Sequence, residues 1–214
     1  MLAVFKRELK SYFSSPVGYV CVAALACLYG FFYFGVMLSG SSSFITQVYS
    51  SMFMFGMMII PIITMKTMSE DRKNKTDQAL LTAPVGVTAI VVGKFLAAFA
   101  VYAIASVIGL LPAVAMSTFS SPPWGIIFGN FIATLLYGGA MISIGVFISS
   151  LTVSQVIAAI GTFVGDAIGW VSFTQRYNVF TQGIFSVSSC VFFLSIIAVF
   201  VFLTARKVES RRWN

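Results

Sequence analysis

Long apolar stretches dominate the chain and recur six times, separated by short polar connections. A helix needs about 20 apolar residues to cross the hydrocarbon core of a bilayer, and about 17 is the lower end of the range. Five of the six stretches reach this length. The remaining one, Val156–Val171, is shorter and contains Asp166. The pattern therefore predicts an all-α membrane protein with six transmembrane helices. We expect them at Val17–Leu38, Val48–Met65, Phe95–Met116, Ile126–Ile148, Val156–Val171 and Ile184–Ala205.

The residues before the first span predict an amphipathic helix within segment 1–15. At 100° per residue its apolar side chains fall on one arc and its basic side chains on the neighbouring arc. The apolar set is Leu2, Phe5, Leu9, Tyr12 and Phe13, and the basic set is Lys6, Arg7 and Lys10. Ser14, Ser15 and Pro16 then interrupt the helix. Such a helix lies in the membrane interface, either as a simple anchor or as a link to a cytoplasmic partner.

Composition and charge agree with this assignment and give an orientation. The chain is 59% hydrophobic and 9% charged, against about 45–50% apolar and about 25% charged residues in soluble domains. If both termini are cytoplasmic, 12 of the 13 Lys and Arg lie inside and only Arg176 lies outside, as the positive-inside rule requires. The net charge of +7 then reflects topology and contact with anionic membrane lipid rather than nucleic-acid binding. Residues 16–205 form one membrane domain, and 206–214 form a cytoplasmic tail.

The cytoplasmic connection at residues 66–85 is the most polar part of the chain. It begins with a mixed-charge cluster, Glu70, Asp71, Arg72 and Lys73. Thr76 is a suitable N-cap for a short helix, Asp77–Leu81, which Pro84 would end. This helix would present Leu80 and Leu81 to water unless a partner or the bilayer surface covers them. Two interpretations are open: the helix docks into a groove of another protein, or the segment is a solvated loop resting on lipid headgroups.

The fifth span carries a stripe of small residues. Gly161, Gly165 and Gly169 recur at intervals of four, so they share one helix face and allow another helix to approach closely. Asp166 lies beside this stripe as an intramembrane acid. It lines a cavity, pairs with a cation or is protonated, or else it reaches the outer interface, about 7–8 Å away at helical rise. Gly138, Gly139 and Gly145 of the fourth span are expected to serve helix packing.

The sequence shows none of the common catalytic motifs, although the residue count leaves a Ser-Lys dyad open. It has no His, which removes the usual proton shuttle and the commonest metal ligand. No GxxxxGK[ST] motif is present, because Gly93-Lys94 is followed by Phe95 and has no glycine five residues before it. Lys94 is expected to snorkel from a cytoplasmic helix end towards water. Cys21, Cys27 and Cys190 lie inside predicted spans without metal-ligand spacing and are expected to be apolar fillers. We therefore expect no enzymatic activity, no metal and no cofactor bound by this chain.

The order of these parts resembles the membrane subunits of type-2 ABC exporters, closest to the small bacterial permeases associated with gliding motility or multidrug export. The resemblance rests on an amphipathic helix ending at Ser-Pro, six spans, and a loop of the form Glu70-Asp71-Arg72-Lys73…Thr76…Leu80-Leu81…Pro84-Val85 before Gly93-Lys94. It implies a permease of the bacterial inner membrane that works with a separate P-loop ATPase, which binds the ATP, and with a second permease subunit, identical or different. It also implies that Glu70, Arg72, Thr76, Leu80, Leu81 and Pro84 form the coupling helix that contacts the ATPase.

The chain departs from the family pattern on the outer side. Family members usually carry extra membrane-dipping turns between spans five and six, whereas here Val171 passes almost directly into the last span. This shortening favours an alternative function, a membrane scaffold or regulator that docks an ATPase without transporting anything.

Overall fold

The expected all-α fold is confirmed in the part of the chain that the structure describes. The structure is a computed structural model, and it describes residues 1–39, 44–73, 86–118, 123–152, 154–181 and 186–212, in which every regular element is a helix. Five helical stretches in this part are long and apolar enough to cross a membrane. They are Pro16–Leu38, Ile45–Asp71, Val87–Met116, Trp124–Leu151 and Val187–Ser210. The sixth span stays a prediction.

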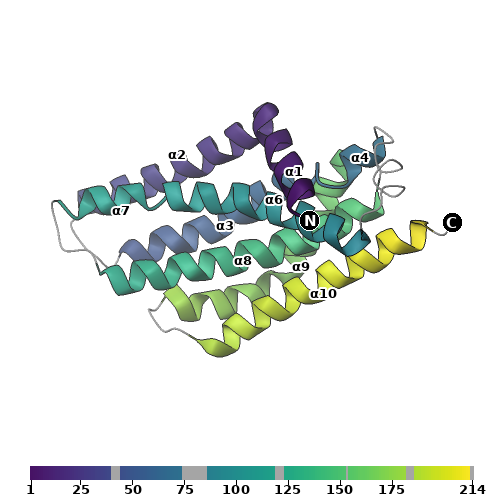
Figure 1. Ribbon diagram of the computed structural model, residues 1–214. Helices are drawn as coiled ribbons and strands as arrows, with labels where there is room; N and C mark the ends of the chain where they lie inside the picture. The colour runs from purple at the N-terminus through teal and green to yellow at the C-terminus, as the bar shows by residue number, and fades with distance from the viewer. Residues whose placement is uncertain (40–43, 74–85, 119–122, 153, 182–185, 213–214) are drawn as a thin grey trace.

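The N-terminal amphipathic helix and the break after it are confirmed. Helix α1, Leu2–Ser14, ends at Ser15, whose extended backbone turns the chain, and α2, Pro16–Ser39, begins at the next residue. Proline suits this position because the first residues of a helix need no amide donor. Figure 1 shows α1 lying across one end of the bundle, at a steep angle to α2.

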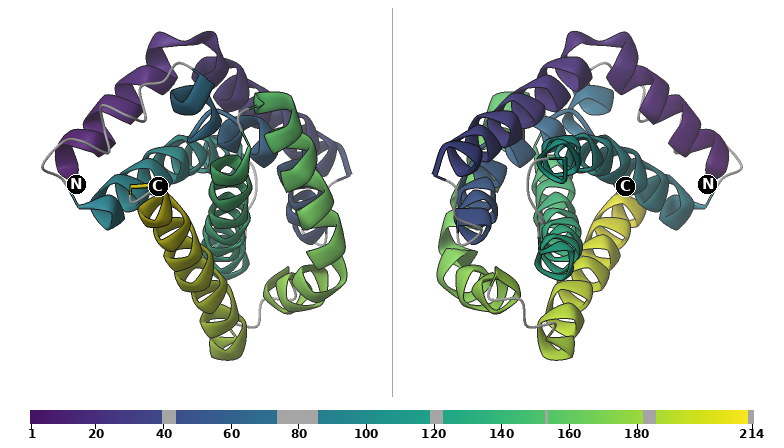
Figure 2. Two further views of the ribbon diagram at one scale, coloured as in Figure 1. Left: turned by 90° about the vertical axis from the view of Figure 1, so that its right-hand side faces the viewer. Right: turned by 90° about the vertical axis from the view of Figure 1, so that its left-hand side faces the viewer.

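The long helices run side by side, with α8, Trp124–Leu151, in contact with most of the others. It packs against α3, Phe44–Thr64, α6, Val87–Ile108, α9, Gln155–Thr181, and α10, Val187–Arg212. Both termini, α1 and the short helix α4, Ser69–Lys73, lie at one end of the bundle (Figure 1). Figure 2, which looks along the bundle, shows α1 reaching from the start of α2 to the start of α6.

The expected third span is divided into two helices. Its expected start at Phe95 is wrong, because the first helix, α6, already begins at Val87; α6 ends at Ile108, and α7 covers Leu111–Met116. The division follows from Pro112, which has no amide hydrogen to donate to a preceding turn. Gly109 at the division allows a close contact, because a Cβ atom there would lie 2.5 Å from the ring of Tyr29.

The expected end of the fifth span at Val171 is wrong, because α9 continues to Thr181. Phe173, Tyr177 and Phe180 lie at helical spacing in this extension, and all three are buried against the core. Figure 2 shows α9 curving around the edge of the bundle. The apolar part of α9 that the structure describes, Gln155–Gly165, is shorter than the five candidate spans. Helix α10 likewise runs on through residues 206–212 of the expected tail.

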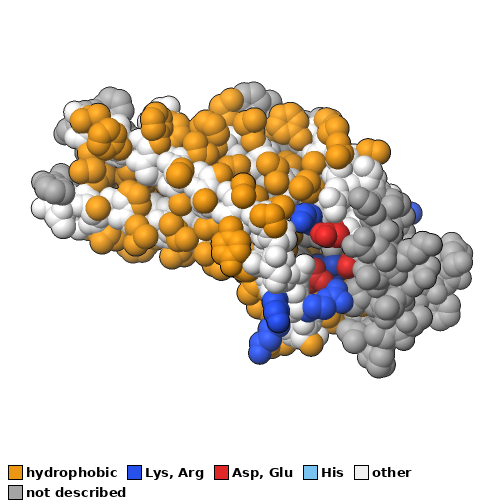
Figure 3. All heavy atoms as spheres, turned by 90° about the horizontal axis from the view of Figure 1, so that it is seen from above, with side chains coloured by type: hydrophobic (Ala, Val, Ile, Leu, Met, Phe, Trp, Pro, Cys, Tyr) orange, Lys and Arg blue, Asp and Glu red, His pale blue; other side chains and the backbone are white. Residues whose placement is uncertain are grey.

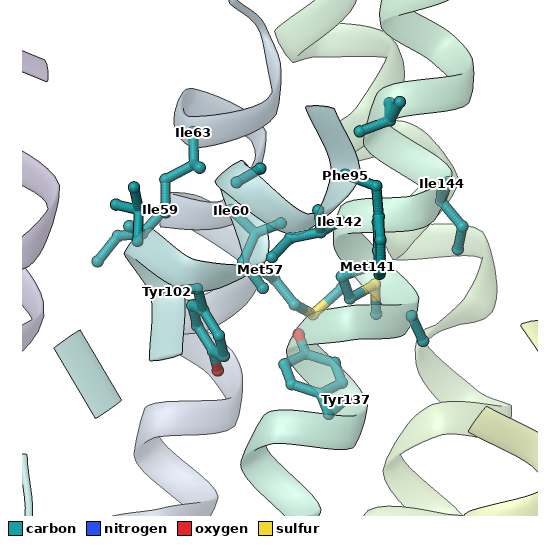
Figure 4. Close-up of a cluster of buried hydrophobic side chains, with 14 of the residues drawn as sticks. Met57, Ile59, Ile60, Ile63, Phe95, Tyr102, Tyr137, Met141, Ile142 and Ile144 are labelled. Atoms are coloured by element: carbon teal, nitrogen blue, oxygen red, sulfur yellow. The ribbon is translucent and has the colours of Figure 1, made fainter. Parts of the chain in front are cut away.

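The interior contains tyrosines whose hydroxyl groups bind neighbouring helices. The Tyr33 hydroxyl donates to that of Tyr49 over 3.1 Å, and the Tyr137 hydroxyl donates to the Phe53 carbonyl over 3.2 Å. Figure 4 shows the Tyr137 ring among the methionine and isoleucine side chains of the core. A buried hydroxyl without a partner is costly, so these bonds allow phenols inside an apolar bundle and connect its helices.

Glycines of α8 permit the closest helix contacts, in agreement with the packing role expected for them. A Cβ atom at Gly138 would overlap the ring of Tyr102, and one at Gly145 would overlap the side chain of Thr64. Helix α8 can therefore approach α6 and α3 only because these positions have no side chain.

We predict that Gly138→Ala lowers the melting temperature of the chain in detergent. The added methyl group must displace the buried Tyr102 ring, and overpacking of this kind costs about 1–3 kcal/mol. The matched control is Gly129→Ala on the same helix, where an added Cβ meets no atom within 4 Å. Equal melting temperatures for the two variants would contradict this account of the α6–α8 contact.

Candidate functional site

Charged side chains gather at the end of the bundle that carries α1 and α4. Figure 3 shows them beside the residues drawn in grey, whereas the remainder of that face is mostly apolar. Arg7 and Glu8 come from α1, Asp71 from α4 and Lys94 from α6. We call these four residues the charged junction. Asp71 belongs to the cytoplasmic connection at residues 66–85 that the sequence singles out, and Lys94 follows that connection in the chain.

Lys94 is the centre of the charged junction. Helix α6 begins at Val87, so Lys94 lies about two turns inside the helix, and its side chain is only 2% exposed. Its Nζ lies 2.5 Å from Asp71 Oδ2 and 3.3 Å from Glu8 Oε1, and it donates a hydrogen bond of 2.6 Å to the Thr67 carbonyl. An ammonium group has three N–H donors, and here three oxygen atoms surround it.

The snorkelling expected for Lys94 is therefore wrong. A side chain that snorkels carries its charge into water, but the ammonium group of Lys94 is buried among protein oxygens. Hydrophobicity places Lys94 near the end of a span without revealing the carboxylates that face it. Those carboxylates come from α1 and α4, which are distant in the sequence and adjacent only in the fold.

Arg7 balances the charge of the junction. One ammonium group between two carboxylates would leave a net negative charge, and the Arg7 guanidinium lies 2.5 Å from Glu8 and 3.8 Å from Asp71. Burial by itself would lower the pKa of Arg7, but its hydrogen bond to Glu8 and the charges of Glu8 and Asp71 raise that pKa above its ordinary value. The junction thus contains two positive and two negative groups, an arrangement that lowers the cost of burying charge.

Gly93 explains why α1 can approach α6 so closely. A Cβ atom at Gly93 would lie 3.1 Å from the Val4 side chain and 3.3 Å from the Met1 carbonyl oxygen. Val4 is buried in this contact. Gly93 therefore allows the backbone of α1 to approach α6, and the neighbouring Lys94 binds the carboxylate of Glu8 on α1.

The C-terminal half of α1 is held by the end of α3. The Tyr12 hydroxyl donates to the Ile63 carbonyl over 2.8 Å, and burial raises the pKa of Tyr12. Lys66 Nζ donates to the Ser15 hydroxyl over 3.0 Å. Helix α1 is therefore fixed to the protein along its length and is not solely a lipid anchor.

Ser149 of α8 holds the start of α4. Its hydroxyl accepts hydrogen bonds of 3.1 Å from the amides of Met68 and Ser69. The first amides of a helix have no partner within the helix, so a hydroxyl from α8 satisfies two that would otherwise be unbonded. The turn between α3 and α4 is consequently held by α1, α6 and α8 together.

The residues expected to contact an ATPase fall only partly within the described chain. Glu70 lies in the first turn of α4, is half-buried and lines a small hollow between α1 and the end of α3. Arg72 lies in α4, and its side chain is outside the described part. Thr76, Leu80, Leu81 and Pro84 lie outside the described residues. The contact of this segment with a partner stays a prediction.

The glycine stripe of α9 has two kinds of neighbour. A Cβ atom at Gly161 would lie 2.9 Å from Ile148, and one at Gly165 would lie 3.4 Å from the same side chain, which belongs to α8. Gly169 faces Phe173 of its own helix. Asp166 lies within α9, and its side chain is outside the described part. The role of the stripe in packing, like that of Asp166, stays a prediction.

Sequence reasoning missed Glu8, Asp71 and Lys94 as a set. One signal was available: Glu8 is the single acidic residue of α1, and an acid among basic interfacial side chains indicates a specific partner. The acidic first turn of α4, with Glu70 and Asp71, was a second signal, because it is typical of a helix start.

Fold and site together define a multi-pass helical membrane protein in which one charged end fixes the start of a polar connection. The chain belongs to a known transporter family: the model described as "ABC-2 family transporter protein" matches residues 2–207. The protein is thus a type-2 ABC permease, a membrane component of transport. No curated protein matches the chain.

We predict that Ser149→Ala loosens the start of α4. Removing the hydroxyl leaves two amides without their acceptor, at a cost of about 1–3 kcal/mol. Hydrogen exchange in the peptide spanning residues 65–73 should become about tenfold faster for each 1.4 kcal/mol lost. The control is Ser143→Ala, whose buried hydroxyl bonds to a carbonyl of its own helix. Unchanged exchange in Ser149→Ala would show that α4 does not depend on α8.

Proposed function

We propose that this chain is the permease subunit of an ABC exporter and works with a separate ATPase subunit that binds and hydrolyses ATP. The observation that carries the proposal is the family match over residues 2–207. It is supported by the missing nucleotide motif, since a permease without a P-loop needs its ATPase in trans.

The segment proposed to contact the ATPase begins in α4, which also supplies Asp71 to the charged junction. Its base, α4, is bound by Lys94 of α6 and Ser149 of α8. A partner that binds the segment would therefore act on a base that is attached to the membrane helices. We propose Glu70, Arg72, Thr76, Leu80, Leu81 and Pro84 as the contact residues and a second permease subunit as the other half of the pathway.

The orientation belongs to this proposal. We place both termini in the cytoplasm of a bacterium and six spans in its inner membrane. Support comes from the arrangement in Figure 1, where both termini, α1 and α4 lie at the same end of the bundle. Lys6 and Lys10 belong to α1 at this end, Lys66 belongs to the turn between α3 and α4, and Arg176 belongs to the last turns of α9.

The second candidate is a membrane scaffold or regulator that docks an ATPase without transport. The feature that favours it is the short connection between Thr181 of α9 and Val187 of α10. Reconstituting the chain with its ATPase in liposomes separates the two candidates. A permease should show compound-stimulated ATP hydrolysis together with movement of that compound across the bilayer, and a scaffold should show neither.

We predict that cysteines introduced at Ser42 and Ser121 react with an impermeant reagent added outside intact cells. Cysteines at Gln78 and Asn214 should react only after the membrane is opened, since all basic connections then lie inside. The native Cys21, Cys27 and Cys190 are replaced first. Labelling of the Gln78 position from outside would overturn this topology.

We predict that the double variant Leu80→Asp/Leu81→Asp loses its ATPase partner. Burying one leucine in a groove contributes about 1.5–3 kcal/mol, so losing both should weaken association at least about a hundredfold. The measurement is recovery of the ATPase in a pull-down in detergent, with circular dichroism to verify the helical fold.

A matched control for this experiment is Gln78→Asp/Thr82→Asp, which adds the same charge to polar neighbours. The control variant should recover as much ATPase in the pull-down as the parent chain does. Undiminished recovery with the leucine double variant would mean that the segment is a solvated connector.

A further inference from the structure

Lys94 connects α1 to the base of the cytoplasmic connection. Through Glu8 it binds α1, and through Asp71 and the Thr67 carbonyl it binds the base of the cytoplasmic connection. All three contacts are made by one buried nitrogen atom, within 3.3 Å. A displacement of α4 therefore changes the surroundings of the atom that holds α1.

Helix α1 is in turn rigidly joined to α2. A single residue, Ser15, separates the two helices. A Cβ atom at Gly18 would lie 2.5 Å from the Tyr12 carbonyl oxygen, so the start of α2 lies directly against the end of α1. Movement of α1 must therefore move the N-terminal end of the first membrane helix.

Stability alone does not explain a charged group at this point. Replacing a buried ion pair by well-packed apolar residues is often neutral or stabilising. What charged hydrogen bonds add over apolar contacts is direction, because each N–H must point at its own oxygen. Lys94 thus fixes the register between α1 and α4, whereas a methionine of similar length would let them slide.

We propose that Lys94 is a positioning residue that makes α1 and the base of the cytoplasmic connection move as one unit. Motion that a bound ATPase imposes on the connection passes through Asp71, Lys94 and Glu8 to α1, and from α1 to α2. The proposal rests on the proposed function for the identity of the partner, but the link between α1 and α4 exists in the chain alone.

The link is tested first in the purified chain without any partner. Spin labels are attached to cysteines replacing Lys10 on α1 and Glu70 on α4, after the native cysteines are removed, and the distance between them is measured in lipid nanodiscs. The distribution should be narrow in the parent chain and broad in Lys94→Met, where the only cation left between Glu8 and Asp71 in the charged junction is Arg7, which is half exposed and 3.8 Å from Asp71. An equally narrow distribution in Lys94→Met would overturn the link.

A milder variant tests the same link in case Lys94→Met does not fold. Glu8→Gln removes the charged arm towards α1, together with the Arg7–Glu8 pair within α1, and leaves the Lys94–Asp71 pair in place. It should broaden the same distribution while the chain stays folded. The control is Glu209→Gln, which breaks the exposed pair with Arg206 on α10 and should change nothing. If Glu8→Gln behaves like this control, α1 is held by its apolar contacts and Lys94 is not the link.

Transmission is tested in the complex with the ATPase, with labels replacing Lys10 on α1 and Lys207 on α10. Trapping the complex with ATP and vanadate should shift this distance in the parent chain. Glu8→Gln should lose most of the shift while ATPase binding and hydrolysis persist, a separation that a purely structural role would not produce. A shift that is absent in the parent chain or fully retained in Glu8→Gln overturns the transmission. Failure of the parent chain to bind an ATPase counts against the proposed function instead, and the nanodisc result stands by itself.

Discussion

The buried ammonium group of Lys94 is the interaction on which the charged end of this protein depends. Its three oxygen partners come from α1, from α4 and from the turn before α4. Removing an ammonium group from water costs several kcal/mol, and only close opposite charges compensate for this. Because Glu8 and Asp71 supply those charges, α1 and α4 must both be in place for Lys94 to be buried at all. The amphipathic helix, the cytoplasmic connection and α6 therefore adopt one mutual arrangement.

The apolar part of the bundle makes this arrangement possible by a second constraint, close approach of helices. Lipid tails are as apolar as leucine, so helices in a membrane associate through tight packing and hydrogen bonds. Gly138 and Gly145 admit Tyr102 and Thr64, and Gly93 admits α1 in the same way at the charged end. The phenol hydroxyls that bridge helices in the interior supply the hydrogen bonds. Glycines that allow close approach, together with polar groups that bond between helices, thus occur both in the core and at the charged junction.

Hydropathy and helix periodicity were sufficient to predict α1, the break at Ser15 and the rough positions of five spans, because these features depend on local sequence. The start of the third span at Val87, before the expected Phe95, was not predicted. The division at Pro112 was not predicted, because this proline lies inside a long apolar stretch that hydropathy treats as one span. The extension of α9 to Thr181 was not predicted, because it depends on burial of Tyr177 in the folded chain. The partners of Lys94 were missed for the same reason, because Glu8 and Asp71 meet it only in the folded chain. The contact residues from Thr76 to Pro84 stay predictions of sequence and family resemblance.

A double-mutant cycle between Glu8 and Lys94 tests the central claim most directly. The free energy of unfolding is measured in mixed detergent micelles for the parent chain, Glu8→Gln, Lys94→Met and the double variant. If Lys94 holds α1 through this carboxylate, the two losses should fail to add, with a coupling energy of about 1–3 kcal/mol. Additivity within about 0.5 kcal/mol, the behaviour of independent sites, would show that α1 rests on the bundle without this ion pair and would contradict the account.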